Sequence, residues 1–340
     1  MGGSLLPFVS VVMAVRNEQD NIASSLNSVV AQDYPVSRME VIVVDGSSED
    51  ATKQIAAGIA EDARTAERSE VNLMDNPART VPVSLNLALR RARGEIIVRV
   101  DGHTEIAKDY VRRCVQALES TGADNVGGIQ RAEGRLGFGR AIAIATSSRF
   151  GAGDARFRYS KRAEWVDTVY MGAFRRSVFE KVGGFDEELV RNQDDEFNLR
   201  VRRAGGRVFL DPTIRSTYRP REKLGDLWSQ YFGYGLFKVL VIRKHSRISS
   251  WRQLVPSTFI AGLLASVVLA VVTGTPFLAL AVAGPYVFAV LGLSFWLGRN
   301  DPECIILLQV VFPTLHLAYG SGFLAGLWRW RGRRRAVQPT

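Results

Sequence analysis

The chain has 340 residues, 46% of them hydrophobic, so it is long enough for two ordinary domains and can form a sizeable core. Its formal net charge of +10 is compatible with nucleic acid, anionic lipid or phosphorylated substrates as partners. The two cysteines, Cys114 and Cys304, argue against a disulfide framework or a zinc site and favour a reducing compartment.

Strand and helix patterns alternate through the first part of the chain. Apolar, β-branched runs predict strands over residues 8–15, 39–44, 71–74, 95–100 and 125–129. Helical spacing predicts helices over residues 21–30, 50–62, 81–93 and 107–118. This order predicts an α/β fold with a mainly parallel sheet flanked by helices.

Polar residues follow three of the predicted strands. They are Arg16-Asn17-Glu18, Asp45-Gly46-Ser47 and Asp101-Gly102-His103. Ligands bind outside the carboxyl ends of such sheets, so we expect a site there. The carboxylate of Asp101 and the imidazole of His103 suit Mn²⁺ or Mg²⁺, with substrate phosphate oxygens completing the coordination. The alternative is an ordinary turn, because Asp-Gly also starts many strand-to-helix loops.

Several nucleotide and metal motifs are missing. No G-x-G-x-x-G follows the first strand, and the nearest match, residues 320–325, lies in an apolar segment where glycines permit close helix packing. The chain also has no Walker-type loop and no His-Glu-x-x-His. Dinucleotide binding, nucleotide hydrolysis and metalloprotease chemistry are therefore disfavoured.

The C-terminal part has the pattern of a membrane protein. Residues 254–298 and 304–328 carry no charge, and the first run is interrupted near residues 273–276. We expect three apolar helices, with His316 requiring a polar partner or a lipid headgroup. Three crossings would place the arginine-rich tail opposite the N-terminal part. Two crossings plus a re-entrant or interfacial segment would keep both on one side.

Aromatic residues are interleaved with polar ones over residues 224–240, just before the apolar runs. This pattern predicts an interfacial helix, in which the aromatic side chains anchor the chain to the bilayer or present a lipid phosphate. The short apolar run near the N-terminus is typical of a strand rather than of a cleaved signal. We therefore expect the first 250 residues to be cytoplasmic.

Four ordered motifs carry a resemblance to a known family. They lie in residues 11–18, 43–50, 100–103 and 192–200. Together they resemble family 2 glycosyltransferases, which implies a Rossmann-like GT-A fold. In its Asp-Gly-His variant and its C-terminal apolar helices, the chain is similar to membrane-bound bacterial glycosyltransferases of succinoglycan-type exopolysaccharide synthesis.

The resemblance implies a nucleotide-sugar site at the strand ends. Asp45 would accept a hydrogen bond from the uracil or ribose of the donor, with Asn17 and Glu18 flanking the same nucleotide. Asp101 would contact the donor and, with His103, hold the metal that bridges its diphosphate. Most relatives have a second Asp at the position of His103. These acids and amides are also common helix caps.

The same resemblance implies a catalytic base. Asp194 matches the Asp that takes the proton of the acceptor hydroxyl in an inverting transfer. The family usually has Glu where this chain has Gln193, and Asp195 adds an adjacent carboxylate in the acceptor region, which also includes Gly172. A negatively charged helix N-terminus is the structural alternative.

We therefore expect a catalytic domain over residues 1–222, an interfacial segment over 223–253, a transmembrane region over 254–328 and a basic tail over 329–340. The expected enzyme is a multi-pass protein of the cell membrane, with its catalytic domain on the cytoplasmic face. It is expected to use Mn²⁺ or Mg²⁺ to transfer one sugar, glucose, from a UDP-sugar to a polyprenyl-diphosphate-linked saccharide. The resemblance also bears on processivity: processive relatives carry Gln-x-x-Arg-Trp in this region, and its absence near Gln230 favours single-sugar addition.

Three alternatives stay open at this point. A polyprenyl-phosphate sugar synthase would use the bare lipid phosphate as acceptor. The chain could also be an inactive scaffold of an export complex, in which Gln193 and His103 would mark the loss of the carboxylates that the family usually has at these positions. Nucleic-acid binding is disfavoured, because the basic residues cluster beside apolar runs.

Overall fold

The computed structural model describes residues 6–134, 137–220, 222–248 and 250–332, and it divides into two compact units. Unit 1 contains the residues up to Arg131 together with Ala155–Arg219. Unit 2 contains Ala132–Asp154 and the residues from Pro220 onward. Nothing in the sequence pattern indicated that residues 132–154 group with the C-terminal helices.

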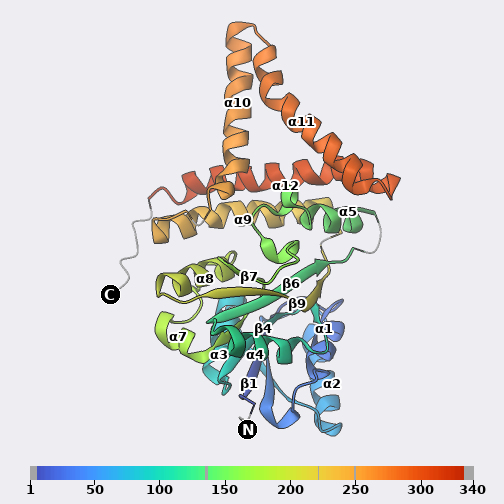
Figure 1. Ribbon diagram of the computed structural model, residues 1–340, viewed down its shortest axis with the longest axis vertical. Helices are drawn as coiled ribbons and strands as arrows, with labels where there is room; N and C mark the ends of the chain where they lie inside the picture. Colours follow the sequence, from blue (N-terminus) through green and yellow to red (C-terminus); the bar gives the residue numbers. More distant parts are fainter. Residues whose placement is uncertain (1–5, 135–136, 221, 249, 333–340) are drawn as a thin grey trace. The chain divides into compact units, whose positions relative to one another are not determined.

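Unit 1 is built on a mixed sheet, which has nine strands in the described part of the chain (Figure 1). One half is parallel, in the order β3 (Glu70–Asp75), β2 (Met39–Asp45), β1 (Val9–Val15) and β4 (Ile96–Asp101). The order continues through β8 (Ala173–Arg175), β6 (Asn125–Ala132), β9 (Val208–Tyr218) and β5 (Thr104–Ile106), with β7 (Glu164–Val166) beside β9. The pairs β4–β8, β6–β8, β5–β9 and β7–β9 are antiparallel.

The central strands read as continuous apolar runs because both faces of the sheet are covered. On β1, Val11 and Met13 pack with α1 (Ile22–Val30) and α4 (Tyr110–Thr121). The intervening Val12 packs on the opposite face, with α3 (Val81–Arg91) and α8 (Gln193–Arg203). The remaining helices of unit 1 are α2 (Thr52–Thr65) and α7 (Arg176–Val182).

The expected α/β fold is confirmed. All five predicted strands and all four predicted helices are present, with ends displaced by a few residues. In the antiparallel half of the sheet, β6 was predicted, but β5, β7, β8 and β9 were not. Strands of three residues, such as β5 and β8, are too short to show a period-two pattern, and β9 contains Pro212, which usually argues against a strand.

Unit 2 is helical. It contains α5 (Gly137–Thr146), α6 (Arg149–Ala152), α9 (Leu224–His245), α10 (Val255–Thr273), α11 (Phe277–Gly298) and α12 (Pro302–Arg329). The last three are long and apolar enough to cross a membrane. The expected break at residues 273–276 is present, because α10 ends at Gly274 in the left-handed conformation (φ +66°).

The expected polar partner of His316 is found within unit 2. Its Nε2 lies 2.9 Å from the carbonyl oxygen of Phe150, and its Nδ1 lies 2.9 Å from the hydroxyl of Tyr286. A neutral imidazole can donate to the carbonyl and accept from the hydroxyl, so both ring nitrogens are used. Packing against neighbouring segments therefore satisfies this side chain. Of the predicted basic tail, residues 333–340 lie outside the described residues.

Candidate active site

The polar motifs of the sequence converge at one edge of unit 1. Strands β2, β1 and β4 are adjacent and parallel, so their carboxyl ends lie side by side. Asp45 ends β2, Asn17 and Glu18 follow β1, and Asp101 ends β4. Residues from three separate segments are thereby brought together where α/β sheets bind their ligands.

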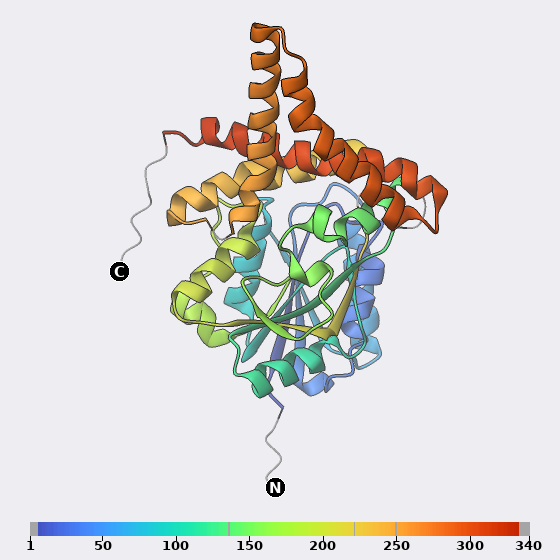
Figure 2. The same cartoon turned by 45° about the horizontal axis from the view of Figure 1, so that its top comes forward.

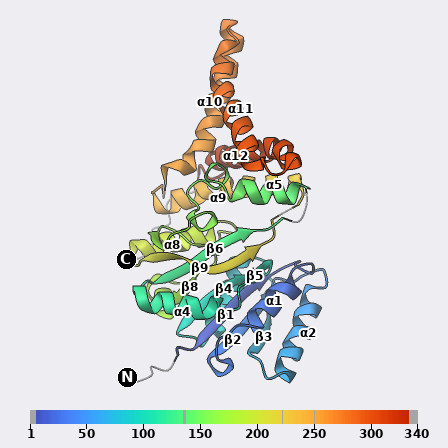
Figure 3. The same cartoon turned by 45° about the vertical axis from the view of Figure 1, so that its right-hand side comes forward.

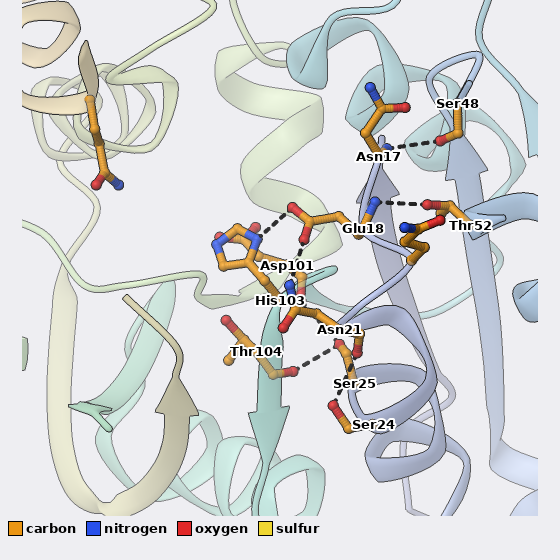
Figure 4. Close-up of polar contacts among 12 residues, drawn as sticks. Asn17, Glu18, Asn21, Ser24, Ser25, Ser48, Thr52, Asp101, His103 and Thr104 are labelled. Carbon is orange, nitrogen blue, oxygen red and sulfur yellow. Dashed lines mark hydrogen bonds and ion pairs between the residues drawn. The ribbon is translucent and has the colours of Figure 1, made fainter. Parts of the chain in front are cut away.

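Hydrogen bonds join the loops after β1 and β2 (Figure 4). The backbone N–H of Asn17 donates to Oγ of Ser48 over 3.0 Å, and Oδ1 of Asn17 accepts from the N–H of Glu49 over 2.9 Å. Asn17 and Ser47 both adopt left-handed backbone conformations (φ 53° and 55°), which non-glycine residues seldom adopt. Such conformations cluster at ligand sites, where the surrounding structure holds them.

Asp45 is buried and fixes its own loop. Its Oδ2 accepts from the backbone N–H of Ser48 over 3.0 Å, and its Oδ1 accepts from the hydroxyl of the same residue. The structure therefore supports a role for Asp45 in forming the loop that follows β2. A contact with uracil or ribose stays a prediction.

Arg99 binds the candidate metal ligand Asp101 and interacts electrostatically with the candidate base Asp194. Its side chain is only 5% exposed, and both Nε and Nη2 lie 2.9 Å from Oδ1 of Asp101. Burial alone would raise the pKa of Asp101, but Arg99 and His103 outweigh it and hold that pKa below its ordinary value. Asp101 is therefore a carboxylate at neutral pH. Nη1 of Arg99 is buried and has no hydrogen-bond acceptor among the described residues.

His103 is oriented by Glu18 (Figure 4). Nδ1 of the imidazole lies 3.0 Å from Oε1 of Glu18, whose Oε2 accepts from the side-chain amide of Asn21 over 3.1 Å. Gly102 permits this approach, because a Cβ there would lie 2.9 Å from Cγ1 of Val15 and 3.4 Å from Cγ of Glu18. The Asp-Gly-His sequence thus has a steric reason for its middle residue.

Asp194 faces the sheet from the first turn of α8. It lies three and four positions before Phe197 and Asn198, both fully buried, so these side chains share one face of the helix. Burial raises the pKa of Asp194; Arg99 opposes that rise and Asp195 adds to it. Asp194 therefore lies within electrostatic range of Arg99, with its pKa moved from the ordinary value toward neutrality.

The other two residues expected in the acceptor region have clear local roles. The backbone N–H of Asp195 donates to Oδ1 of Asp194 over 2.9 Å, so it fixes the rotamer of its neighbour. Gly172 has a φ of +95°, and a Cβ there would lie 2.6 Å from Oδ1 of Asn125. Backbone conformation and packing therefore explain this glycine; its contact with an acceptor stays a prediction.

The donor atoms at the end of β4 fit a divalent cation as part of a larger coordination sphere. A metal-binding histidine commonly gives its other ring N–H to a carboxylate, which is the relation between His103 and Glu18. With Nδ1 bonded to Glu18, Nε2 is the ring atom suited to a metal. Within the described ranges, no cluster of three or more His, Cys, Asp or Glu side chains could hold an ion. Asp101 and His103 would therefore need substrate oxygens beside them.

In an enzyme that binds its metal through His103, this geometry would make Glu18 a positioning residue. Glu18→Gln should weaken Mn²⁺ binding in the presence of UDP by roughly 10- to 100-fold, the usual cost of losing a carboxylate behind a metal-binding histidine. Isothermal titration of the full chain would measure this. Glu49→Gln is the matched control, since Glu49 lies in the neighbouring loop with an exposed side chain paired to Arg79. Equal Mn²⁺ affinity in Glu18→Gln and the control would contradict the assignment.

Sequence reasoning missed the interactions of Arg99 and Tyr170 with Asp101. The hydroxyl of Tyr170 lies 2.7 Å from Oγ1 of Thr104. A hydrogen bond from Tyr170 also lowers the pKa of Asp101. The signal for Arg99 was available, because it is a single charge in the apolar run 96–100, where an unpaired arginine would be costly. Tyr170 lies in a loop without such a signal.

Comparison with known proteins agrees with this architecture. The model of Glycosyl transferase family 2 matches residues 10–183. Succinoglycan biosynthesis protein ExoA of Rhizobium meliloti (strain 1021) is 31% identical over 327 residues, which cover 95% of this chain and 96% of that protein. A Methanococcus voltae protein is 26% identical over 70% of this chain and 74% of its own length. Its name is dolichyl N-acetyl-alpha-D-glucosaminyl phosphate 3-beta-D-2,3-diacetamido-2,3-dideoxy-beta-D-glucuronosyltransferase.

The fold also matches a solved structure. Mannosyltransferase PcManGT from Pyrobaculum calidifontis, determined in complex with GDP-Man and Mn²⁺, aligns with a TM-score of 0.64. The alignment covers 96% of this chain and 88% of that one at 21% identity, which shows a shared fold. With the family match over residues 10–183 and the 31% identity to ExoA across nearly the full length, the chain belongs to glycosyltransferase family 2 and is a glycosyltransferase with the GT-A fold.

Proposed function

We propose that this enzyme transfers one glucose from a UDP-sugar to a polyprenyl-diphosphate-linked saccharide, with inversion at the anomeric carbon, in cell-surface polysaccharide synthesis. The observation that carries the proposal is the pair of carboxylates, Asp101 and Asp194, that both interact electrostatically with buried Arg99. One carboxylate belongs to the candidate metal site and the other to the candidate base. Donor activation and acceptor deprotonation thus have separate groups in one site.

On the donor side, Asp101 and His103 would hold Mn²⁺ or Mg²⁺, with Asn17, Glu18 and Asp45 in the loops around the nucleotide. The bound ion would neutralise the charge that develops on the departing nucleoside diphosphate. Arg99 keeps Asp101 ionised and lies at the same strand end. Glu18 holds His103 in place from the neighbouring loop.

On the acceptor side, Asp194 accepts the proton of the attacking hydroxyl. The acceptor oxygen forms its bond to the anomeric carbon as the bond from that carbon to the diphosphate oxygen breaks on the opposite side. A single displacement of this kind inverts the configuration. The raised pKa of Asp194 makes it a stronger base than an ordinary aspartate once it is ionised.

The names of the relatives support a lipid-linked saccharide as the acceptor. Succinoglycan biosynthesis is a polysaccharide process, and the Methanococcus voltae relative is named for an acceptor sugar joined to dolichyl phosphate. The second name favours addition to a sugar already carried by a lipid, rather than a polyprenyl-phosphate sugar synthase. The apolar helices of unit 2 support such an acceptor, because three of them are long and apolar enough to cross a membrane. We place its catalytic domain on the cytoplasmic face.

Mass spectrometry of lipid products tests this proposal. The full chain in liposomes would receive a panel of nucleotide sugars and either a polyprenyl-diphosphate monosaccharide or bare polyprenyl phosphate. We expect UDP-glucose to yield a lipid-linked disaccharide with one added hexose. A lipid monosaccharide made from bare polyprenyl phosphate would identify a synthase instead. Absence of product and of donor hydrolysis with every pair would contradict the proposed activity.

A further inference from the structure

The three apolar helices of unit 2 differ in how far protein surrounds them. In the most apolar 18-residue window, 6% of residues are buried for the segment ending in α10, 11% for α11 and 44% for α12. A helix that crosses a bilayer faces lipid on most of its surface. α10 and α11 are therefore mostly exposed, whereas a much larger share of α12 is buried.

α12 runs alongside α9 in the same direction. A Cβ at Gly322 of α12 would lie 2.1 Å from the carbonyl oxygen of Phe232, so the two backbones touch. Further along both helices, the indole N–H of Trp330 donates to the carbonyl of Leu236 over 3.2 Å. Arg243 then donates to the carbonyl of Trp330. The C-terminal half of α12 must therefore lie at the same membrane depth as α9.

α9 is unsuited to the hydrocarbon core. It carries Asp226, Lys238, Arg243 and Lys244 within 22 residues, and it is not among the candidate spans found in the described ranges. Charged groups in the core of a bilayer are costly and rare, whereas a helix mixing aromatic and basic residues suits the interface. Because α9 belongs at the interface, α12 is held there too.

The N-terminal half of α12 is bound to another non-spanning segment. Leu308, Val311, Phe312 and Leu315 form one cluster with Ala141, Ile142 and Ala145 of α5. Arg140 of α5 pairs with Asp301, just before α12, over 2.9 Å. His316 bonds the carbonyl of Phe150 in α6. Segment 137–152 carries Arg140 and Arg149, so this half of α12 is also tied to chain that does not enter the hydrocarbon.

α10 and α11 form a hairpin with the properties of a membrane insert (Figure 2). Their 19 and 22 residues correspond to roughly 28 and 33 Å, close to the hydrocarbon thickness of about 30 Å. Trp251 before α10 and Trp296 in the last turns of α11 are 69% and 59% exposed. Arg252 and Arg299 lie over their rings, as expected at a membrane interface. The connection at residues 273–276 is uncharged.

We propose that α10 and α11 cross the bilayer as a two-helix hairpin, while α12 lies along the membrane surface beside α9. Figure 3 shows α9 and α12 running across the base of the hairpin. The exposed apolar residues of α12, namely Ile306, Val310, Leu327 and Trp328, then dip into the headgroup region.

Two crossings return the chain to the side on which it entered. Arg329 and Arg331 therefore lie on the same side as Arg252, Arg299 and the catalytic domain, in agreement with the positive-inside rule. Three crossings would separate these charges. The packing of α12 thus decides between the topologies that composition alone left open.

Cysteine accessibility tests the proposal in the full chain. In a Cys114→Ser, Cys304→Ser background, single cysteines would be placed at Ala66 in unit 1, at Thr275 in the hairpin connection and at Gly332 after α12. All three positions are exposed. A membrane-impermeant maleimide would be added to sealed vesicles of both orientations, and detergent-solubilised samples would report total labelling.

We expect Ala66→Cys and Gly332→Cys to be labelled from one side and Thr275→Cys from the other. Labelling of Gly332→Cys together with Thr275→Cys, opposite to Ala66→Cys, would mean three crossings and overturn the proposal. Labelling of all three from one side would show that the hairpin does not cross, and would overturn it equally.

Discussion

Asp194→Asn should retain metal-dependent binding of UDP and lose sugar transfer by roughly 10²- to 10⁴-fold, the usual scale for removal of a general base. The substitution keeps the size of the side chain and an oxygen for the backbone N–H of Asp195, which lies 2.9 Å from Oδ1. It removes only the group that accepts the proton. Steady-state transfer and titration of UDP in the presence of Mn²⁺ would separate these effects.

Asp195→Asn is the matched control. Asp195 occupies the same first helical turn, but Asp194 is the residue whose pKa is affected by Arg99 and Asp101 of the candidate site. We expect the control to retain most of the transfer activity. A larger loss in Asp195→Asn than in Asp194→Asn would move the base by one position, and no loss in either would contradict the single-displacement mechanism.

The pH profile gives an independent check on the same residue. Because burial raises the pKa of Asp194, the base is ionised only above that raised value, and transfer should fall as the pH drops through it. The charged groups that act on this carboxyl are Arg99, Asp195 and Asp101. The acid limb of kcat/KM should therefore lie above the ordinary range of an aspartate.

Asp101→Asn should weaken Mn²⁺-dependent donor binding and lower transfer by on the order of 10²- to 10³-fold, the scale for losing one group that stabilises developing charge. The variant removes a carboxylate oxygen from the end of β4 and leaves buried Arg99 without its ionic partner. Thermal unfolding of the variant would reveal a purely structural effect.

Asp75→Asn is the control for Asp101→Asn. Asp75 ends strand β3 at the edge of the same parallel half of the sheet, where it pairs with Lys53 through an exposed side chain. The unmodified enzyme provides the complementary test, because a chelator should abolish transfer and Mn²⁺ or Mg²⁺ should restore it. Full transfer in excess chelator would contradict metal dependence without any substitution.

The parallel half of the sheet was predictable because buried parallel strands are continuous apolar runs. The runs at residues 8–15, 39–44 and 95–100 each end in polar residues, and parallel pairing brings those ends together. Asn17, Asp45 and Asp101 could therefore be placed at one edge from the sequence alone. The resemblance to a known family, rather than periodicity, pointed to Asp194.

Contacts between distant segments could not be predicted. The pairing of Glu18 with His103 depends on the close approach of two loops at Gly102, which no local pattern shows. The same holds for segment 137–152, whose packing on α12 becomes visible only in three dimensions. The number of membrane crossings could not be predicted for the same reason. α12 is apolar enough to cross a membrane, and only its contacts with α5 and α9 indicate that it does not.

We propose that Asp101 and His103 hold a metal ion that also binds the diphosphate of the donor. Pulsed electron paramagnetic resonance of Mn²⁺ bound to the full chain with UDP tests this coordination. We expect couplings of Mn²⁺ to a histidine nitrogen and to phosphorus, with the nitrogen coupling lost in His103→Asp. Bound Mn²⁺ that shows no nitrogen coupling, or whose nitrogen coupling persists in His103→Asp, would contradict it.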